Sequence, residues 1–423
     1  MKAHPLNLAV FRIVLFGVLL YFIPRNLIAV SGLPAELRVA PPGYGAFFEW
    51  IPINPALSQG MLGVCVLCCI CGLIGFRTRT ASFGALITGL YVYGVPQFFG
   101  KINHYHHFLL FLAVLAVSRS GDYLSVDWLV FLKKKKPMLS ELYGLPLQMI
   151  WLLFGIIYFF PGYWKLRVSG LAWAFSDNLK YAMYHKWHEL GGFHPPLPLD
   201  AHPLLFKTAA LAVILFECLF IFLVFNRRTR IPLALGGLFF HWATGAFMGI
   251  AFWELRWFYV VFFDWAKLLR LQPVQAERAS AQSLLPVRVM GYGLSFVMIV
   301  CGFTYFDSWP FAVYPTFAYL AQPKVTAVEV SIDENGESIT VDAAKFSKLF
   351  GGEARWTNIQ HRIINAEGAA RQTLCENVAK SMHESFKDLA EATQITFMQT
   401  ERWVDPQLQD EPPLKEETLC EIR

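Results

Sequence analysis

Lys165 follows a long apolar run with no acidic residue beside it, in the stretch Tyr158–Leu166 (YFFPGYWKL). An ammonium in or near hydrocarbon is costly, so it either reaches outward to the interface or lies in a dry site where its amine acts as a base. Pro161 and Gly162 precede it, and we expect them to break the helix and let Lys165 point into the bundle. An interfacial lysine is the simpler alternative.

A second polar group, Asn103–His107 (NHYHH), opens another apolar run. Three histidines within four residues suggest metal ligation. However, His104 and His107 share a helix face while His106 points elsewhere, and no carboxylate lies nearby as a fourth ligand. We therefore expect Asn103 and His104 to hydrogen-bond a polar ligand, and we predict no metal site.

His241 and Glu217 both lie inside apolar runs, in Phe239–Thr244 and Leu215–Cys218. An ionisable residue within a membrane is a candidate functional group. His241 either bridges two helices by a hydrogen bond or lines a pocket at the edge of an aromatic ligand. Glu217 is protonated, or it pairs with Lys165 or a histidine; a purely structural hydrogen bond fits equally well.

The composition places these residues in a membrane protein. Of the 423 residues, 55% are hydrophobic and only 16% are charged, whereas soluble domains carry about 25% charged residues. The net charge is +5, and the basic residues lie in short clusters between apolar runs. This pattern indicates topology signals and not nucleic-acid binding. A cluster of four cysteines, Cys65, Cys68, Cys69 and Cys71, lies in one apolar run, where cysteine behaves as a small hydrophobic residue.

Apolar runs of about the 20 residues that cross a bilayer recur along the chain. They predict an all-α polytopic bundle of about nine transmembrane helices over residues 1–310. The runs lie near 7–28, 58–75, 81–98, 106–118, 145–161, 205–225, 231–250, 252–266 and 288–306. The runs at 106–118 and 252–266 are the weakest, and the latter could be re-entrant.

Four basic clusters predict the orientation: Arg77–Arg79, Lys133–Lys136, Arg227–Arg230 and residues 267–278. Lysine and arginine are enriched in short cytoplasmic loops. With nine spans and a cytoplasmic N-terminus, all four clusters are cytoplasmic and the C-terminal end lies outside. We expect the bacterial inner membrane as the location.

Residues 311–423 differ from the rest and predict a small extracytoplasmic α+β domain. Residues 325–332 alternate like a strand, residues 333–336 form a turn, and residues 338–341 begin a return strand. Residues 367–390 have helical spacing, and residues 395–404 suggest another strand. Cys375 and Cys420 either pair, if the compartment is oxidising, or stay free.

Residues 5–310 resemble the HTTM (horizontally transferred transmembrane) family, which includes the vitamin K-dependent γ-glutamyl carboxylases. The matching segments occur in the family's order and at similar intervals. They are Tyr158–Leu166, Asn103–His104, Tyr123–Leu129 (YLSVDWL), Phe216–Glu217 and Phe240–His241.

In those carboxylases a lysine at the position of Lys165 deprotonates vitamin K hydroquinone. Oxygen then adds to the quinol anion, the resulting base removes the γ-proton of a glutamate, CO2 adds, and the quinone leaves as its epoxide. The resemblance implies that Asn103, His104 and His241 surround the quinol and glutamate sites, and that Glu217 occupies an acidic position.

The chain departs from the carboxylases at three places. Trp164 stands where they commonly have a second lysine, and Arg167–Ser169 replaces an acidic pattern. The C-terminal part is far smaller than the lumenal region with which they grip propeptides. The resemblance therefore implies quinol chemistry more than propeptide-directed carboxylation.

We expect a membrane-embedded, carboxylase-like, quinol-dependent oxygenase in which Lys165 is the base. Asn103, His104, His241, Glu217 and Trp164 would form the quinol and substrate site. The resemblance implies vitamin K hydroquinone or menaquinol as the cofactor, with O2 and CO2, and it implies membrane lipid, a lipid quinone and a peptide or protein acceptor as partners. The alternative is a non-catalytic protein that reuses the fold to bind lipid or quinone or to anchor a partner.

Overall fold

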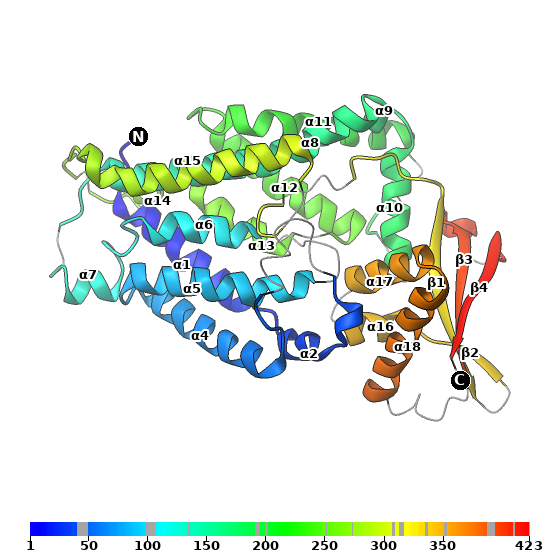
Figure 1. Cartoon of the computed structure of the whole chain (residues 1–423). Helices are drawn as coiled ribbons and strands as arrows, with labels where there is room; N and C mark the ends of the chain where they lie inside the picture. Colours follow the sequence, from blue (N-terminus) through cyan, green and yellow to red (C-terminus); the bar gives the residue numbers. More distant parts are fainter. Residues whose placement is uncertain are drawn as a thin grey trace.

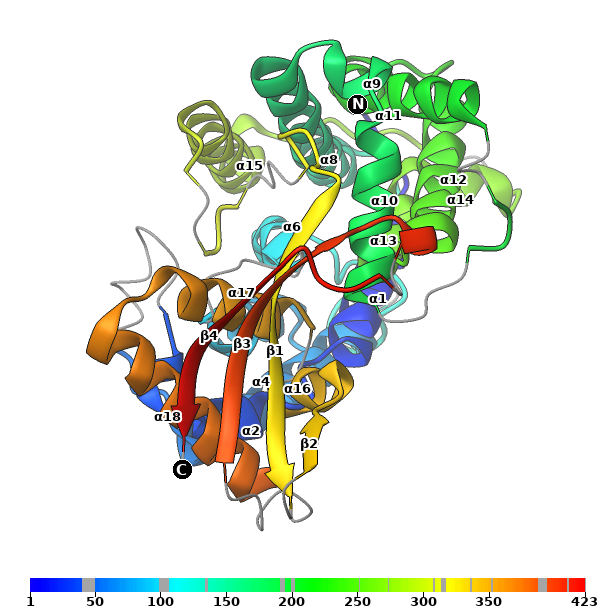
Figure 2. The same cartoon turned by 90° about the vertical axis from the view of Figure 1, so that its right-hand side faces the viewer.

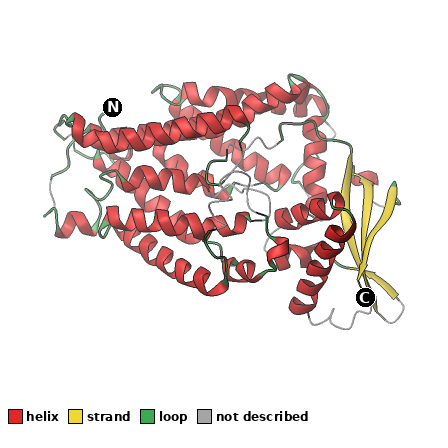
Figure 3. Cartoon of the chain, viewed as in Figure 1, coloured by secondary structure: helices red, strands yellow, loops and turns green. Residues whose placement is uncertain are grey.

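Helices make up most of the molecule, and a small antiparallel sheet lies at one end of it (Figures 1 and 3). The computed structural model describes residues 1–39, 50–98, 106–133, 136–190, 195–198, 202–250, 252–272, 274–306, 309–312, 317–334, 337–350, 353–386, 394–408 and 411–422. The long helices run roughly along one axis, which ends at the sheet in Figure 1.

Within the described residues, five helices are long and apolar enough to cross a membrane. They are α4 (Pro55–Ile74), α8 (Glu141–Ser169), α11 (Pro203–Leu223), α12 (Arg230–Met248) and α15 (Ala281–Thr304). Two further apolar helices are shorter, α1 (Pro5–Tyr21) and α6 (His106–Ala116), and α5 (Thr78–Gly94) lies between α4 and α6. The helical bundle with apolar, membrane-length helices was therefore predicted, but the described residues support five such spans and not nine.

The predicted span at 252–266 is not one helix. It divides into α13 (Trp253–Phe258), a short 3-10 helix η4 (Tyr259–Phe262) and α14 (Trp265–Leu268). The Asp264 side chain accepts from the backbone N–H of Lys267 and so begins α14 anew. These pieces pack on α1, and only one side of them, including Leu255 and Phe258, is buried. Hydropathy reports burial in protein as readily as burial in lipid, so the sequence did not separate the two.

The helix α8 forms the centre of the bundle, between α11 and α15. It begins at Ser140, whose hydroxyl accepts from the Leu142 N–H, and it ends before Gly170. It runs without interruption through Pro161, so the predicted break there was wrong. Proline removes one backbone hydrogen bond, and packing along both sides of α8 outweighs that loss.

The end of the bundle away from the sheet holds the N-terminus, α7 (Val126–Val130) and α14 (Figure 1). Ala3 forms a bridge with Ser140, and the Asn7 side chain donates to Asp264. The Arg230 guanidinium lies 4.2 Å from the Trp151 ring centroid. These contacts, and the bond from the Arg77 N–H to Asp127 of α7, bring the described parts of the four basic clusters toward the same end of the molecule.

The C-terminal sheet is antiparallel throughout, with strand order β2-β1-β3-β4 (Figure 2). Its strands are β1 (Lys324–Glu334), β2 (Glu337–Thr340), β3 (Gln394–Trp403) and β4 (Lys415–Ile422). The helices α16 (Ala343–Phe350), α17 (Glu353–Asn365) and α18 (Gly368–Ser385) lie between the sheet and the bundle. β1, β2, β3 and α18 agree with the predicted elements, whereas α16, α17 and β4 were not predicted.

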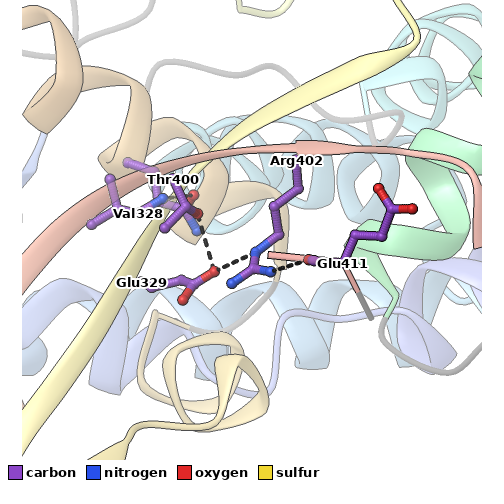
Figure 4. A network of polar contacts seen from close by, with 6 residues as sticks. Val328, Glu329, Thr400, Arg402 and Glu411 are labelled. Atoms are coloured by element: carbon purple, nitrogen blue, oxygen red, sulfur yellow. Dashed lines mark hydrogen bonds and ion pairs between the residues drawn. The ribbon is translucent and has the colours of Figure 1, made fainter. Parts of the chain in front are cut away.

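A disulfide between Cys375 and Cys420 joins α18 to β4. The sheet's other face carries a polar network, in which Glu329 accepts from Arg402 and Thr400 (Figure 4). Arg402 also donates to the Glu411 carbonyl. The C-terminal part is therefore a tightly cross-linked unit.

Two arginines fasten this unit to the bundle. Arg355 donates to the Pro96 carbonyl at the end of α5, and Arg362 donates to the Leu37 carbonyl after α2 (Leu27–Gly32). Helix α17 thus holds the C-terminal unit against the bundle.

Candidate functional site

Lys165 and Glu217 form a buried ion pair between α8 and α11. The Lys165 Nζ lies 2.6 Å from Glu217 Oε1 and 2.7 Å from Oε2, and each residue is only 4% exposed. A lone charge at this depth would be strongly unfavourable, but two opposite charges with both carboxylate oxygens bonded offset much of that penalty. The alternative of a lysine reaching outward to the interface is wrong.

The close approach of the two helices depends on Gly162. A β-carbon at this position would lie 2.8 Å from the β-carbon of Glu217 and equally close to Cys218 Sγ. Gly162 and Lys165 are three residues apart and so share a face of α8. The glycine therefore lets α11 approach close enough for Glu217 to reach the amine.

Beside the ion pair lies a cavity of about 130 Å³ with mostly apolar walls. It is open on one side and is lined mainly by residues of α8, α10 (Asn178–Glu189), α11, α12 and α13. Its polar wall residues are Tyr158, Lys165, Glu217, His241, Thr244 and His107. Charged and hydrogen-bonding groups thus border a largely apolar space.

His241, on α12, belongs to a chain of hydrogen bonds. Its Nε2 lies 2.6 Å from the Tyr158 hydroxyl, which lies 2.6 Å from the Tyr259 hydroxyl. Its other nitrogen, Nδ1, is buried and has no hydrogen-bond partner among the described residues. The imidazole is therefore held on one side and is free to bond a ligand on the other.

Gly237 makes room for this chain, because a β-carbon there would lie 2.1 Å from the Tyr259 hydroxyl oxygen. Both tyrosines and His241 are almost completely buried. Buried polar groups that satisfy one another are rigid, so the orientation of the imidazole is set before any ligand arrives.

Residues 317–321, which lead from the bundle to the sheet, lie beside the cavity at the Lys165 side. Trp173, whose ring centroid is 5.1 Å from Lys165 Nζ, donates from its indole N–H to the Phe317 carbonyl. The Ser169 hydroxyl donates to the Ala318 carbonyl, and the Ala321 N–H donates to the Asn178 side chain. The C-terminal unit is thereby connected directly to the cavity wall.

The structure brings together three of the six predicted site residues: Lys165, Glu217 and His241. Asn103 and His104 lie outside the described residues. Trp164 does not line the cavity: its indole N–H donates 2.8 Å to the Gly302 carbonyl, and its ring packs edge-on against Tyr305. Trp164 thus supports the contact between α8 and α15.

Tyr158, Tyr259 and Trp173 also belong to the site, and the sequence did not single them out. Tyr158 precedes Lys165 by seven residues, which is about two helical turns, so a shared face could have been inferred. No local pattern marks Tyr259, because its segment resembled a continuous span. Within the described residues, no group of histidine, cysteine and acidic side chains could hold a metal ion.

Comparison of the chain with protein-family models, curated proteins and solved structures finds no match. The resemblance to the HTTM family therefore stays a prediction made from the sequence segments.

Proposed function

We propose that this chain is a membrane-embedded, quinol-dependent oxygenase of the carboxylase-like type, with Lys165 as its base. One observation carries the proposal: the Lys165–Glu217 ion pair forms the wall of an apolar cavity that His241 also lines. Deprotonation of a ring hydroxyl needs a base within hydrogen-bonding reach; Lys165 would be that base, Glu217 would store the lysine's own proton, and His241 would hydrogen-bond the ring.

The residues of the cavity fit the ring of a lipid quinol such as vitamin K hydroquinone or menaquinol. Cavities on the order of 150 Å³ hold one benzene-sized ring. This cavity of about 130 Å³ would therefore hold only the hydroxyl-bearing edge of the two-ring quinol head, with the rest of the head and the apolar tail extending out of it. The buried, unpartnered Nδ1 of His241 is available to a ring hydroxyl. Asn103 and His104 would help to position the ring or the acceptor.

For Lys165 to act as a base, its own proton must first move to Glu217. The short contacts to both carboxylate oxygens provide that path, and the result is a neutral amine beside a neutral acid. The amine then takes the proton of a ring hydroxyl and becomes an ammonium ion, which balances the negative charge left on the oxygen. When bound, the quinol would supply the electrons for reaction with O2, and CO2 and a peptide or protein acceptor would complete a carboxylation.

We also propose that the protein lies in a bacterial inner membrane, with its N-terminus in the cytoplasm and its C-terminal unit outside. Two features support this: α7 and α14, which adjoin two of the basic clusters, lie at the end away from the sheet (Figure 1), and a disulfide joins Cys375 to Cys420. A reporter that is active only outside the cytoplasm, fused after Arg423, should be active. A well-expressed but inactive fusion would contradict this orientation.

The enzyme proposal is tested by quinone epoxide formation. Purified protein with vitamin K hydroquinone or menaquinol and O2 should form epoxide, and Lys165→Ala should abolish it. Lys165→Arg should fail too, because a guanidinium stays protonated, whereas Lys348→Ala on α16 should retain full activity. Unchanged epoxide formation by Lys165→Ala would show that this lysine is not the base.

A second candidate is a non-catalytic binding protein for a lipid or a quinone, or an anchor for a partner. The fully paired charge of Lys165 favours it, since a structural ion pair needs no proton transfer. Under this alternative, the wild-type protein forms no epoxide from any of several quinols. Saturable quenching of the protein's fluorescence by a quinone would then identify the cavity as a binding site.

A further inference from the structure

A second pocket lies at the end of the bundle away from the sheet, where α4 ends and α5 begins. Its volume is about 320 Å³. Three arginines line it, Arg77, Arg79 and Arg119, together with the carboxylates Asp122 and Asp127. The pocket shares no residue with the cavity at Lys165.

The carboxylates of this pocket are bonded within the protein. Asp127 accepts from the backbone N–H groups of Arg77 and Thr78 and from the Thr78 hydroxyl. Asp122 accepts from the Tyr143 hydroxyl. Asp127 thereby satisfies the first amides of α5, and among the described residues it forms no ion pair with the three arginines of the pocket.

The three guanidinium groups, in contrast, keep most of their donors. Among the described residues none of the three arginines forms an ion pair, and all three are exposed. Arg79 uses only its Nε, which donates to the Ser118 carbonyl, and Arg77 lies 5.1 Å from the Phe131 ring centroid. A guanidinium presents a planar fork of donors that matches the oxygens of a phosphate.

The rim of the pocket is apolar. Four consecutive large residues, Leu129, Val130, Phe131 and Leu132, are between 37% and 59% exposed, and Lys133 and Lys136 follow them. An exposed apolar run beside basic side chains is typical of a segment that lies in the headgroup region of a bilayer. In Figure 1, α7 lies at the extremity of the bundle, where such a segment would meet the membrane surface.

The scaffold behind the pocket is rigid. Arg12 of α1, which is completely buried, donates to the carbonyls of Ser120 and Leu124. Gly75, with a positive φ of 72°, leaves no room for a β-carbon beside Ser125. The loop that carries Arg119 and the α7 segment is therefore held in place from behind.

We propose that this pocket binds the phosphate headgroup of an anionic glycerophospholipid in the leaflet at this end of the bundle. Arg77, Arg79 and Arg119 would hold the phosphate, and Phe131 and Leu132 would contact the start of the acyl chains. Charge complementarity points to an anionic lipid, and the apolar rim points to a lipid and not to free phosphate. The proposal is independent of the chemistry at Lys165.

The test uses full-length protein in micelles with phosphatidylglycerol or phosphatidylcholine as the added lipid, and it measures retained lipid by native mass spectrometry. We expect the wild type to retain phosphatidylglycerol in preference to phosphatidylcholine. The triple variant Arg77→Gln, Arg79→Gln, Arg119→Gln should lose roughly tenfold or more of this affinity, since each basic group near a membrane surface contributes substantially. Its matched control is Arg227→Gln, Arg228→Gln, Arg270→Gln, which removes the same charge from the same end outside the pocket, and it should bind as the wild type does.

Equal losses in the two triple variants would show diffuse attraction to the surface and would overturn the pocket. Glycerol phosphate that is retained by the wild type as tightly as phosphatidylglycerol is would overturn the lipid assignment. If the triple variant does not fold, the single change Arg119→Gln and the rim variant Phe131→Ser, Leu132→Ser replace it. Unchanged lipid retention in both of these variants would also contradict the proposal.

Discussion

Gly162 of α8 and Glu217 of α11 lie in direct contact, and this contact places a carboxylate within hydrogen-bonding distance of Lys165. Any side chain at position 162 would have a β-carbon 2.8 Å from that of Glu217. The ion pair at the centre of the cavity thus depends on a residue that carries no chemistry itself.

We expect Gly162→Ala to lower the free energy of unfolding by about 1–3 kcal/mol, because an added methyl group forces two packed helices apart. Gly293→Ala on α15 is the matched control, since nothing lies within 4 Å of its added β-carbon. There the change should be neutral or slightly stabilising, because alanine favours helix. Thermal unfolding in detergent measures both, and equal stability of the two variants would contradict the close packing.

The buried ion pair should behave very differently from an exposed one. Lys165→Met leaves Glu217 buried without its partner and should lower the free energy of unfolding by about 3–5 kcal/mol. Adding Glu217→Leu to that variant should recover most of the loss. A double variant as unstable as the sum of the two single variants would contradict direct pairing.

The exposed pair Lys324–Glu401 provides the comparison. Its atoms lie 3.5 Å apart, and its side chains are 41% and 32% exposed. Lys324→Met should change the free energy of unfolding by less than about 1 kcal/mol. The same chemical change thus has a large effect only where both charges are away from water.

Tyr158→Phe should destabilise the protein by about 1–3 kcal/mol, because it leaves His241 Nε2 and the Tyr259 hydroxyl buried without partners. Tyr259→Phe should have a smaller effect, since Tyr158 still bonds to His241. Tyr292→Phe, at a position 54% exposed on α15, should have none. Chemical unfolding in micelles ranks the stabilities of the three variants. A larger loss of stability in Tyr259→Phe than in Tyr158→Phe would show that Tyr158 is not the centre of this hydrogen-bond chain.

The stability of the junction between α10 and the sheet should depend on pH. Burial lowers the pKa of His185 below its ordinary value of 6.5, and the Gln322 carbonyl, which His185 contacts at 2.7 Å, opposes this. Burial also lowers the pKa of His188, and the positive charges of His185 and Arg402 lower it further, against Glu329 and Glu189.

A histidine whose pKa is lower in the folded state takes up its proton first in the unfolded state. Stability is therefore complete above pH of about 6.5 and falls as the pH drops from there toward the folded-state pKa. We expect the melting temperature to decrease between pH 7.5 and 5, and the double variant His185→Gln, His188→Gln to show a weaker decrease. The control is His361→Gln, which changes an exposed histidine on α17. If its melting temperature fell with pH as weakly as that of the double variant, the pH dependence would not come from His185 and His188.

The sequence alone determined that this chain is a helical membrane protein with a different C-terminal part. Apolar runs, scarce charges and the alternation near residues 325–332 are local properties, and each reports the surroundings of its own segment. Lys165, Glu217 and His241 stood out for the same reason, since an ionisable residue in an apolar run is visible without any neighbour.

Tertiary structure alone decided which of these residues meet and how many runs are long helices. Glu217 reaches Lys165 because Gly162 lets α8 and α11 approach, and Tyr259 joins the site because residues 252–266 fold into short pieces that pack on the bundle. Trp164, next to Lys165 in the chain, turns toward α15 instead. Apolar periodicity is the same for a helix facing lipid and one facing protein, so only packing between segments distant in sequence separates a span from a buried core element and assembles the cavity.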